Sequence, residues 1–400
     1  MKQIKMERHV FFIDELGAGG ISTNVVALSS YVASVSSRPI IVRLRTRKNS
    51  ISVYGKQFAD VISPKNFISS LQKGENAEYV FFINSIRTLL TAYFILFLTA
   101  FKNIKIKMVF CVYNPWEFSQ IGYWSSFYRQ LIVTLGANNI YFMDGACYEN
   151  HALAFTIGSI KPIFLPLVIP EVLSSNHGSF SSERKNVLTV GRFVGFKLHY
   201  MRALLQYAKE RPLIDFYFVG YGKYETELRF FVEHNKLKNI YFLGMVQYEK
   251  LHSLYQNANC YVGMGTTLVE ASSVGTPSVV AIAGKPGDVC YGLLVDQTEY
   301  DMGEFRANKP MRSFTNYLDY LLALDSEEFK LLSEQHREYA KQFGVDVVGP
   351  LYLKLCESAK ATRSDFQTVI LWCGLCVATL IYYLNFMLRG RESRYDKPNI

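Results

Sequence analysis

The sequence predicts an α/β protein with two domains, each built on a parallel sheet, followed by a C-terminal membrane helix. Short apolar strand segments alternate with helical segments along most of the 400 residues, a pattern typical of parallel α/β sheets. A polar, serine-rich stretch at 171–186 interrupts this alternation and has the composition of a linker. The run 366–388 carries no charge, and a helix of that length crosses a hydrocarbon core of about 30 Å.

The composition describes a folded, basic chain. Hydrophobic residues make up 50% of it and aromatic residues 15%, which excludes a disordered protein. The net charge of +9 suits phosphorylated substrates, anionic lipid or nucleic acid as partners. Nucleic acid is the least favoured of these, because the sequence has no dense Lys/Arg stripe with interleaved aromatic residues.

Cysteine and histidine spacing predicts neither disulfides nor a metal site. The 7 cysteines are irregularly spaced, which favours a reducing compartment. Cys373 and Cys376 form a C-x-x-C, but they lie in the apolar run, where packing is favoured over redox chemistry. Since the sequence has no H-x-x-x-H, no Cys/His cluster and no Asp-x-Asp pair, we expect no protein-bound metal.

The N-terminal domain is expected over 1–170. Its charged start leads into an apolar segment too short for a signal peptide, so the chain begins with a strand. The expected strands are 9–13, 39–44, 79–84 and 106–113. The helical run 85–101 is apolar nearly all round and too short to span a bilayer, so it is either buried or lies on a membrane surface.

The C-terminal domain is expected over 187–342, and its strands share one feature. The segments that end in glycine are 186–191, 215–220, 239–244 and 259–263. Carboxyl ends of parallel strands meet at one edge of a sheet, and glycines there let the backbone pass close to a ligand. The alternative is that each glycine only makes a tight turn.

The apolar run 366–388 has two interpretations. It could be a buried helix of a soluble domain, but a membrane helix is favoured because the run is uncharged, terminal and flanked by basic residues. Basic residues on both sides nearly balance, so its orientation stays open.

The stretch VGMGTTLVEASSVGTPSVVAI, 262–282, predicts a strand–turn–helix–strand. Gly263 and Gly265 would let a ligand approach, and free N–H groups at the helix start favour phosphate. Glu270 is expected on the first helical turn. It could stabilise the helix N-terminus through the macrodipole, or accept hydrogen bonds from sugar hydroxyls beside a bound phosphate.

Two further elements could meet an anion. In GRFVGFK, Arg192 and Lys197 follow a strand end, and their cationic groups suit a diphosphate, although exposed loop cations are usually only solvated. Gly19 and Gly20 follow the first strand, but without the G-x-G-x-x-G order of a dinucleotide site.

The order of these elements resembles that of the GT-B glycosyltransferases, most closely the family 4 type that uses nucleotide-sugar donors. A Gly-Gly turn is followed by G-R-x4-K, then by a Gly-x-Gly strand end, then by Gly-x-Gly-x4-Glu-Ala-x3-Gly-x-Pro. The likeness covers about 9–356 and is most specific in the C-terminal half. It implies two Rossmann-like domains facing across a cleft, a donor bound chiefly to the second domain, no cofactor, and a crossover region at 343–362 that returns to the first domain.

The resemblance also implies residue roles. Arg192 and Lys197 would neutralise the diphosphate, and Glu270 would hold the ribose as the second glutamate of an E-x7-E motif. Gly19 and Gly20 would approach the donor phosphates and the acceptor. The full set of expected site residues is Gly19, Gly20, Glu117, Arg192, Lys197, Gly220, Gly222, Gly263, Gly265, Thr266, Thr267 and Glu270.

The chain departs from the family pattern at two positions. Val262 stands where the first glutamate of E-x7-E is expected, and the hydroxyls of Thr266 and Thr267 could take its place. The family often presents a histidine near the end of the strand 106–113, whereas this chain has Glu117 in that neighbourhood. Glu117 could contact the acceptor or act as a base, or it could belong to a surface loop.

The sequence therefore predicts a glycosyltransferase that moves a sugar from a nucleotide diphosphate sugar to a lipid-linked or surface-polysaccharide acceptor. The resemblance implies a retaining, metal-independent reaction, and the terminal helix and basic surface predict catalytic domains on the cytoplasmic side of the cell membrane. Two alternatives stay open. One is a non-catalytic nucleotide-sugar-binding or scaffold protein of a polysaccharide assembly complex, which Val262 favours. The other is a nucleotide-sugar epimerase, which the membrane helix disfavours.

Overall fold

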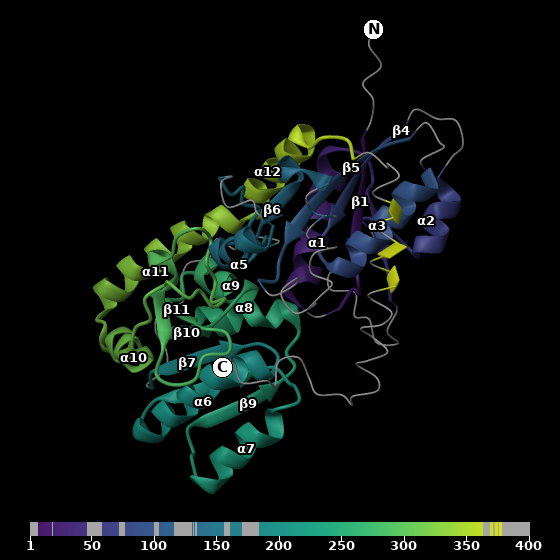
Figure 1. The fold of residues 1–400 in the computed structure, drawn as a ribbon. Coiled ribbons are helices and arrows are strands. Elements are labelled where there is room, and N and C mark those ends of the chain that lie inside the picture. Colours follow the sequence, from purple (N-terminus) through teal and green to yellow (C-terminus); the bar gives the residue numbers. More distant parts are fainter. Residues whose placement is uncertain are drawn as a thin grey trace. The chain divides into compact units, whose positions relative to one another are not determined.

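The chain folds into two compact units, shown in Figure 1. The N-terminal unit is Met1–Pro170 with Val345–Arg391, and the C-terminal unit is Glu171–Gly344 with Glu392–Ile400. The computed structural model describes residues 7–17, 19–45, 58–71, 77–99, 104–115, 130, 132, 134–155, 161–169, 184–362, 369–370, 373–374 and 376–377.

The N-terminal unit is a 6-stranded sheet in the order β3-β2-β1-β4-β5-β6, and all of its strand pairs are parallel. Its strands are β1 Glu7–Ile13, β2 Ile40–Arg43, β3 Asp60–Ile62, β4 Ala77–Ile83, β5 Ile104–Val112 and β6 Ile140–Phe142. Its helices are α1 Gly20–Val35, α2 Pro64–Ser70, α3 Ile86–Thr99, η2 Ala137–Asn139, α5 Gly145–Phe155 and α12 Val345–Ser358. The central strands are continuous apolar runs because helices cover both faces of such a sheet.

The last of these helices, α12, belongs to the first unit although it follows the second in sequence. It packs on α1, where Gly349 lies against the ring of Tyr31. Its Tyr352 is fully buried, and the hydroxyl lies 3.2 Å from Nδ1 of His9 in β1. The region 343–362 therefore carries the chain back onto the N-terminal sheet.

The apolar helix α3 buries one face against the sheet. It contacts β1, β4 and β5, and its inward residues include Leu89 and Tyr93. Phe97 and Leu98 on the last turn stay partly exposed. Burial against the sheet is thus sufficient to explain most of its apolar surface.

The C-terminal unit is a second 6-stranded sheet, in the order β12-β11-β10-β7-β8-β9. Only β12 runs antiparallel to its neighbour among the described strands. Its strands are β7 Asn186–Val190, β8 Asp215–Val219, β9 Ile240–Gly244, β10 Cys260–Gly263, β11 Ser278–Ala281 and β12 Cys290–Leu293. Its helices are α6 Gly195–Glu210, α7 Glu225–His234, α8 Tyr248–Gln256, α9 Thr266–Ser273, η3 Leu294–Asp296, α10 Phe314–Ala323, α11 Ser326–Ala340 and η4 Lys341–Phe343.

Each sheet has one point where the strand order reverses. In the C-terminal unit the chain runs outward from β7 to β9 and then returns to place β10 on the other side of β7. The loops after β7 and β10 therefore leave in opposite directions, and ligands of open α/β sheets bind at such a point. In the N-terminal unit the same reversal falls between β1 and β4.

The predicted membrane helix cannot be compared in full, because most of 366–388 lies outside the described residues. Among the residues that are described, no helix has both the length and the apolar character needed to cross a bilayer. Most of the predicted linker, 171–186, also lies outside them.

Candidate functional site

The candidate site lies at the carboxyl edge of the C-terminal sheet, where β7 and β10 are neighbours. The two cations predicted from GRFVGFK both follow β7. The helix α6 begins at Gly195, soon after β7 ends. Lys197 is therefore held on the first turn of a helix, while Arg192 lies exposed in the short connection before it.

Lys197 lies over the end of its own strand. A Cβ added to Gly191 would come within 2.8 Å of the Lys197 Nζ, so the ammonium lies directly against the backbone at the end of β7. Burial lowers the pKa of Lys197 to about 8, and the nearby charge of Arg192 lowers it further, whereas Glu304 opposes the shift. A half-buried ammonium with a cationic neighbour is poised to gain an anion.

The next strand explains two of the predicted glycines by packing alone. At Gly220 a Cβ would lie 1.9 Å from the carbonyl oxygen of Gly191, and at Gly222 it would lie 2.4 Å from that of Phe193. Neighbouring loops after β7 and β8 thus touch through their backbones. The tight-turn alternative accounts for Gly220 and Gly222 without a ligand.

At β10 the chain enters α9 with only two intervening residues, Met264 and Gly265. Gly265 has φ +73, and a Cβ there would meet open space, so the backbone conformation is what requires glycine. Gly263 lies beneath the ring of Tyr261, with the hydroxyl 2.5 Å from where its Cβ would stand.

The two threonines that begin α9 differ. The Thr267 hydroxyl donates to the carbonyl of Val190 at 3.2 Å and accepts from the Tyr261 hydroxyl at 2.7 Å. It therefore ties the helix start to the end of β7 and is already engaged within the fold. Within the described part of the chain the Thr266 hydroxyl has no hydrogen-bond partner, so it is the threonine that remains able to meet a ligand.

Glu270 is the fifth residue of α9, so the prediction that it lies on the first turn is wrong. Its two carboxyl oxygens accept hydrogen bonds from the hydroxyls of Tyr248, at 3.2 Å, and Tyr255, at 3.1 Å. Burial raises the pKa of Glu270 to about 7, and both tyrosines oppose that shift. Placement beyond the first turn weakens the macrodipole interpretation, because that effect is confined to the terminal turn.

Val262 has a structural explanation. It is fully buried in β10 and belongs to the hydrophobic core of the unit. The connection from β10 to Thr266 is so short that the position eight residues before Glu270 falls inside the strand. A glutamate there would be a charge in an apolar core, which is strongly unfavourable.

One loop at this edge was not predicted. The Gly265 N–H donates to the carbonyl of Met302 at 2.9 Å, which brings Gly303 and Glu304 to the start of α9. Glu304 interacts electrostatically with Lys197. The sequence around it, DMGEFRANKP, contains no motif, and only the fold brings it to the end of β7.

The predicted residues of the N-terminal unit are placed in part. Gly19 is the N-cap of α1 and Gly20 its first residue, at the reversal between β1 and β4. The Thr23 hydroxyl donates to the carbonyl of Gly19 at 3.3 Å. Glu117 lies outside the described residues.

A carboxylate that was not predicted lies at the same reversal. Asp14 directly follows β1, and its Oδ2 accepts a hydrogen bond from the Ser85 hydroxyl at 3.3 Å. Burial raises the pKa of Asp14, although the positive charge of Arg87 opposes the shift. Over the described residues, no group of His, Cys, Asp and Glu side chains is arranged to hold a metal ion.

One protein family matches the sequence of the C-terminal unit. Residues 174–298 match the family described as "Glycosyl transferases group 1". This part of the chain is therefore similar to group 1 glycosyltransferases. The match spans β7 to β12 and includes every candidate residue of this unit except Glu304, and it confirms glycosyltransferase as the enzyme class. No curated protein matches the chain by sequence.

Solved structures share the fold at low identity. Anabaena Alr3699/HepE, solved with UDP and glucose, has a TM-score of 0.64 at 12% identity, with 88% of this chain and 99% of that one covered. A glycosyltransferase from Rickettsia africae has a TM-score of 0.65 at 13% identity, covering 89% and 98%. The lipopolysaccharide outer core galactosyltransferase WaaB has a TM-score of 0.57 at 11% identity, covering 88% and 99%. These likenesses confirm an α/β chain with two Rossmann-like units and are consistent with the GT-B fold.

Proposed function

We propose that the chain transfers a sugar from a nucleotide diphosphate sugar to a lipid-linked or surface-polysaccharide acceptor, and that the donor binds to the C-terminal unit. One observation carries the proposal. Lys197 and Arg192 follow β7, directly beside the N-terminus of α9, at the reversal of strand order in the C-terminal unit. Cations and free helix N–H groups at such a point form a site for a diphosphate.

The expected chemistry is electrostatic. As the bond between the sugar and the diphosphate breaks, negative charge grows on the departing diphosphate. The Lys197 ammonium, the Arg192 guanidinium and the α9 N–H groups would stabilise that charge more in the transition state than in the bound donor. These groups can neutralise a diphosphate without a metal, and we propose a metal-independent, retaining transfer.

Uridine is the proposed donor base, and Glu270 the proposed ribose ligand. Alr3699/HepE was solved with UDP and glucose, which supports a uridine nucleotide in this fold. The Glu270 carboxyl already accepts from two tyrosine hydroxyls, but it has four lone-pair positions and can accept ribose hydroxyls as well.

We further propose that the enzyme works on the cytoplasmic side of the cell membrane. The observations that support this are the net charge of +9 and the uncharged run 366–388. A basic protein with a lipid-borne acceptor gains from proximity to anionic lipid.

The test measures sugar transfer by the purified protein. The protein would be incubated with UDP-glucose, UDP-galactose or UDP-N-acetylglucosamine, together with a membrane extract that supplies the acceptor. We expect labelled sugar in the lipid or glycan fraction with release of UDP, and loss of transfer in Arg192→Ala but not in Arg202→Ala, an exposed arginine of α6 paired with Glu227.

Two results would contradict the proposal. Donor binding without transfer or hydrolysis would establish the non-catalytic alternative, and isomerised donor without transfer would establish the epimerase. The buried position of Val262 removes one reason for the non-catalytic alternative, because the missing carboxylate follows from a short loop.

A further inference from the structure

We propose that Glu304 recognises the sugar of the bound donor by accepting hydrogen bonds from its hydroxyl groups. The inference rests on the proposed function and adds to it the residue that distinguishes a nucleotide sugar from the bare nucleotide. Glu304 lies outside the matched family region, 174–298.

Backbone contacts place the loop of Glu304 on the phosphate side of the site. The Met302 carbonyl accepts from the N–H of Gly265, the N-cap of α9. At Gly303 a Cβ would lie 2.3 Å from the carbonyl oxygen of Ala281, at the end of β11. The loop therefore lies directly against two strand ends, and Glu304 is the next residue.

Two further backbone hydrogen bonds connect the segments that carry Glu304 and Lys197 to the same two residues after β11. The Ala283 N–H donates to the Gly303 carbonyl at 2.8 Å, and the Gly284 N–H donates to the Phe196 carbonyl at 2.7 Å. Two consecutive residues after β11 thus hold the residue before Glu304 and the residue before Lys197. This explains how a carboxylate far along the chain comes to interact with that ammonium.

The segment after Glu304 is fixed as well. The ring of Phe305 lies 3.7 Å from the Lys285 Nζ, and the Arg306 N–H donates to the Tyr291 hydroxyl at 2.8 Å. Such contacts on both sides leave Glu304 little freedom to move away from the strand ends.

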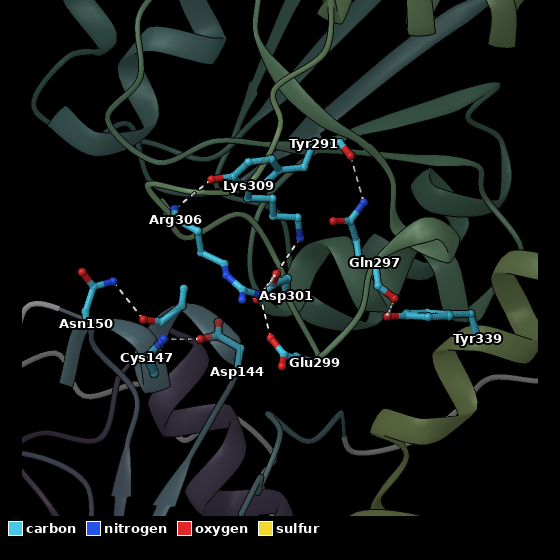
Figure 2. A network of polar contacts seen from close by, with 11 residues as sticks. Asp144, Cys147, Asn150, Tyr291, Gln297, Glu299, Asp301, Arg306, Lys309 and Tyr339 are labelled. Carbon is cyan, nitrogen blue, oxygen red and sulfur yellow. Dashed lines mark hydrogen bonds and ion pairs between the residues drawn. The ribbon is translucent and has the colours of Figure 1, made fainter. Parts of the chain in front are cut away.

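Figure 2 shows the ion network that anchors this segment. Asp301, which is 1% exposed, accepts from the Arg306 guanidinium at 2.7 Å and from the Lys309 ammonium at 2.5 Å. Arg306 also pairs with Glu299 at 2.8 Å. Two cations paired with one buried carboxylate anchor the loop, and a preorganised loop of this kind can position a ligand-binding group.

The chemistry of a carboxylate decides what Glu304 can bind. Carboxylates repel phosphates, but they accept hydrogen bonds from hydroxyls, and sugars are the hydroxyl-rich part of a nucleotide sugar. No carboxylate can come from β10, since Val262 is in the core. Glu304 is therefore placed to meet the part of the donor that lies beyond the phosphates bound by Lys197.

The experiment compares the binding of UDP with the binding of UDP-sugars. Dissociation constants for UDP and for UDP-glucose, UDP-galactose and UDP-N-acetylglucosamine would be measured by calorimetry for the wild type, Glu304→Gln, Glu304→Asp and Glu338→Gln. Glu338 is an exposed carboxylate of α11 and serves as the matched control. Thermal unfolding without ligand would verify that each variant folds.

We expect the best UDP-sugar to bind the wild type more tightly than UDP does. Glu304→Gln should reduce this preference by about 10-fold while leaving UDP affinity nearly unchanged, because a hydrogen bond to a charged group is lost only with the sugar. Glu304→Asp should restore part of it, and Glu338→Gln should match the wild type.

Three results would overturn the inference. If Glu304 only neutralises Lys197, the glutamine variant will bind UDP and UDP-sugar more tightly by the same factor. If the wild type binds UDP and the UDP-sugars with equal affinity, the protein does not recognise the sugar and the role of Glu304 is wrong. The proposed nucleotide site is unaffected by that result. A folded wild type that binds no uridine nucleotide contradicts the proposed donor site, and this inference with it.

Discussion

The two units have the same strand order, but they differ in the side chains at the point where that order reverses. In the C-terminal unit the reversal between β7 and β10 carries Lys197, Arg192 and a helix N-terminus. In the N-terminal unit the reversal between β1 and β4 also has a helix N-terminus, that of α1, but it carries Asp14, hydrogen-bonded to Ser85. The C-terminal reversal therefore gathers groups that attract an anion, whereas the N-terminal reversal includes a carboxylate, which repels one.

The comparison shows that topology supplies a place for a ligand, whereas a few side chains decide which ligand fits. It also separates two uses of glycine. Gly220 is required by backbone packing in the C-terminal unit, but at Gly19 in the N-terminal unit no heavy atom of the described residues lies within 4 Å of an added Cβ. Gly19 is therefore available for close approach by a ligand in a way that Gly220 is not.

The largest expected effect tests this difference between the glycines. Gly220→Ala should destabilise the protein by about 3 kcal/mol or more, because the new methyl overlaps a carbonyl oxygen and φ is +133. Gly19→Ala should cost less, about 1 to 2 kcal/mol, because φ is +159, which side chains rarely adopt, but no described atom lies within 4 Å of the new methyl. Chemical denaturation of both variants gives the comparison, and equal losses would contradict the packing explanation.

The second-largest expected effect comes from substitutions that test whether the anion site is confined to the C-terminal unit. Lys197→Ala should weaken binding of UDP by about 100-fold, because a charge-assisted contact to the diphosphate is lost. Lys209→Ala, at an exposed site on the same helix, should have no effect. Asp14→Asn should leave UDP affinity unchanged, and a comparable loss in that variant would show that both units bind the nucleotide.

The pH dependence of binding sharpens the role of Lys197. Its pKa is about 8, so the ammonium is protonated at pH 7 and loses its proton as pH rises through 8. A bound diphosphate favours the protonated form, and the affinity for UDP-glucose should fall by up to about 10-fold between pH 7.5 and 9. Lys197→Arg keeps its charge, and its affinity should be flat over that range. A wild-type profile as flat as that of the arginine variant would exclude this ammonium from the diphosphate site.

The smallest expected effect is the change that Glu270→Gln makes to the stability of the protein without ligand. Its folded pKa of about 7 lies above the ordinary value of 4.5, so its contribution to stability is fully present below pH 4.5 and is lost as pH rises through 7. Glu270→Gln stays neutral and should be more stable than the wild type by about 1 kcal/mol at pH 8, with little difference at pH 4.5. Thermal unfolding at both pH values measures this, and a difference that does not change with pH would show that burial does not perturb the carboxyl.

The sequence by itself determined the alternation of strands and helices, the two units and the loops after β7 and β10. These follow from local patterns, since apolar runs, helix-start residues and terminal glycines are short-range signals. The same signals led to Arg192, Lys197 and Glu270, which the tertiary structure places in one unit at the reversal of its sheet.

Only the tertiary structure decided how those residues are used. The hydroxyls of Tyr248 and Tyr255 in α8 donate hydrogen bonds to the Glu270 carboxyl. The Thr267 hydroxyl donates to the carbonyl of Val190. Glu304 comes to Lys197 through the ends of β11 and a loop with no motif of its own. Such contacts join residues far apart in the chain, and they depend on strand order and loop packing, which no local pattern encodes.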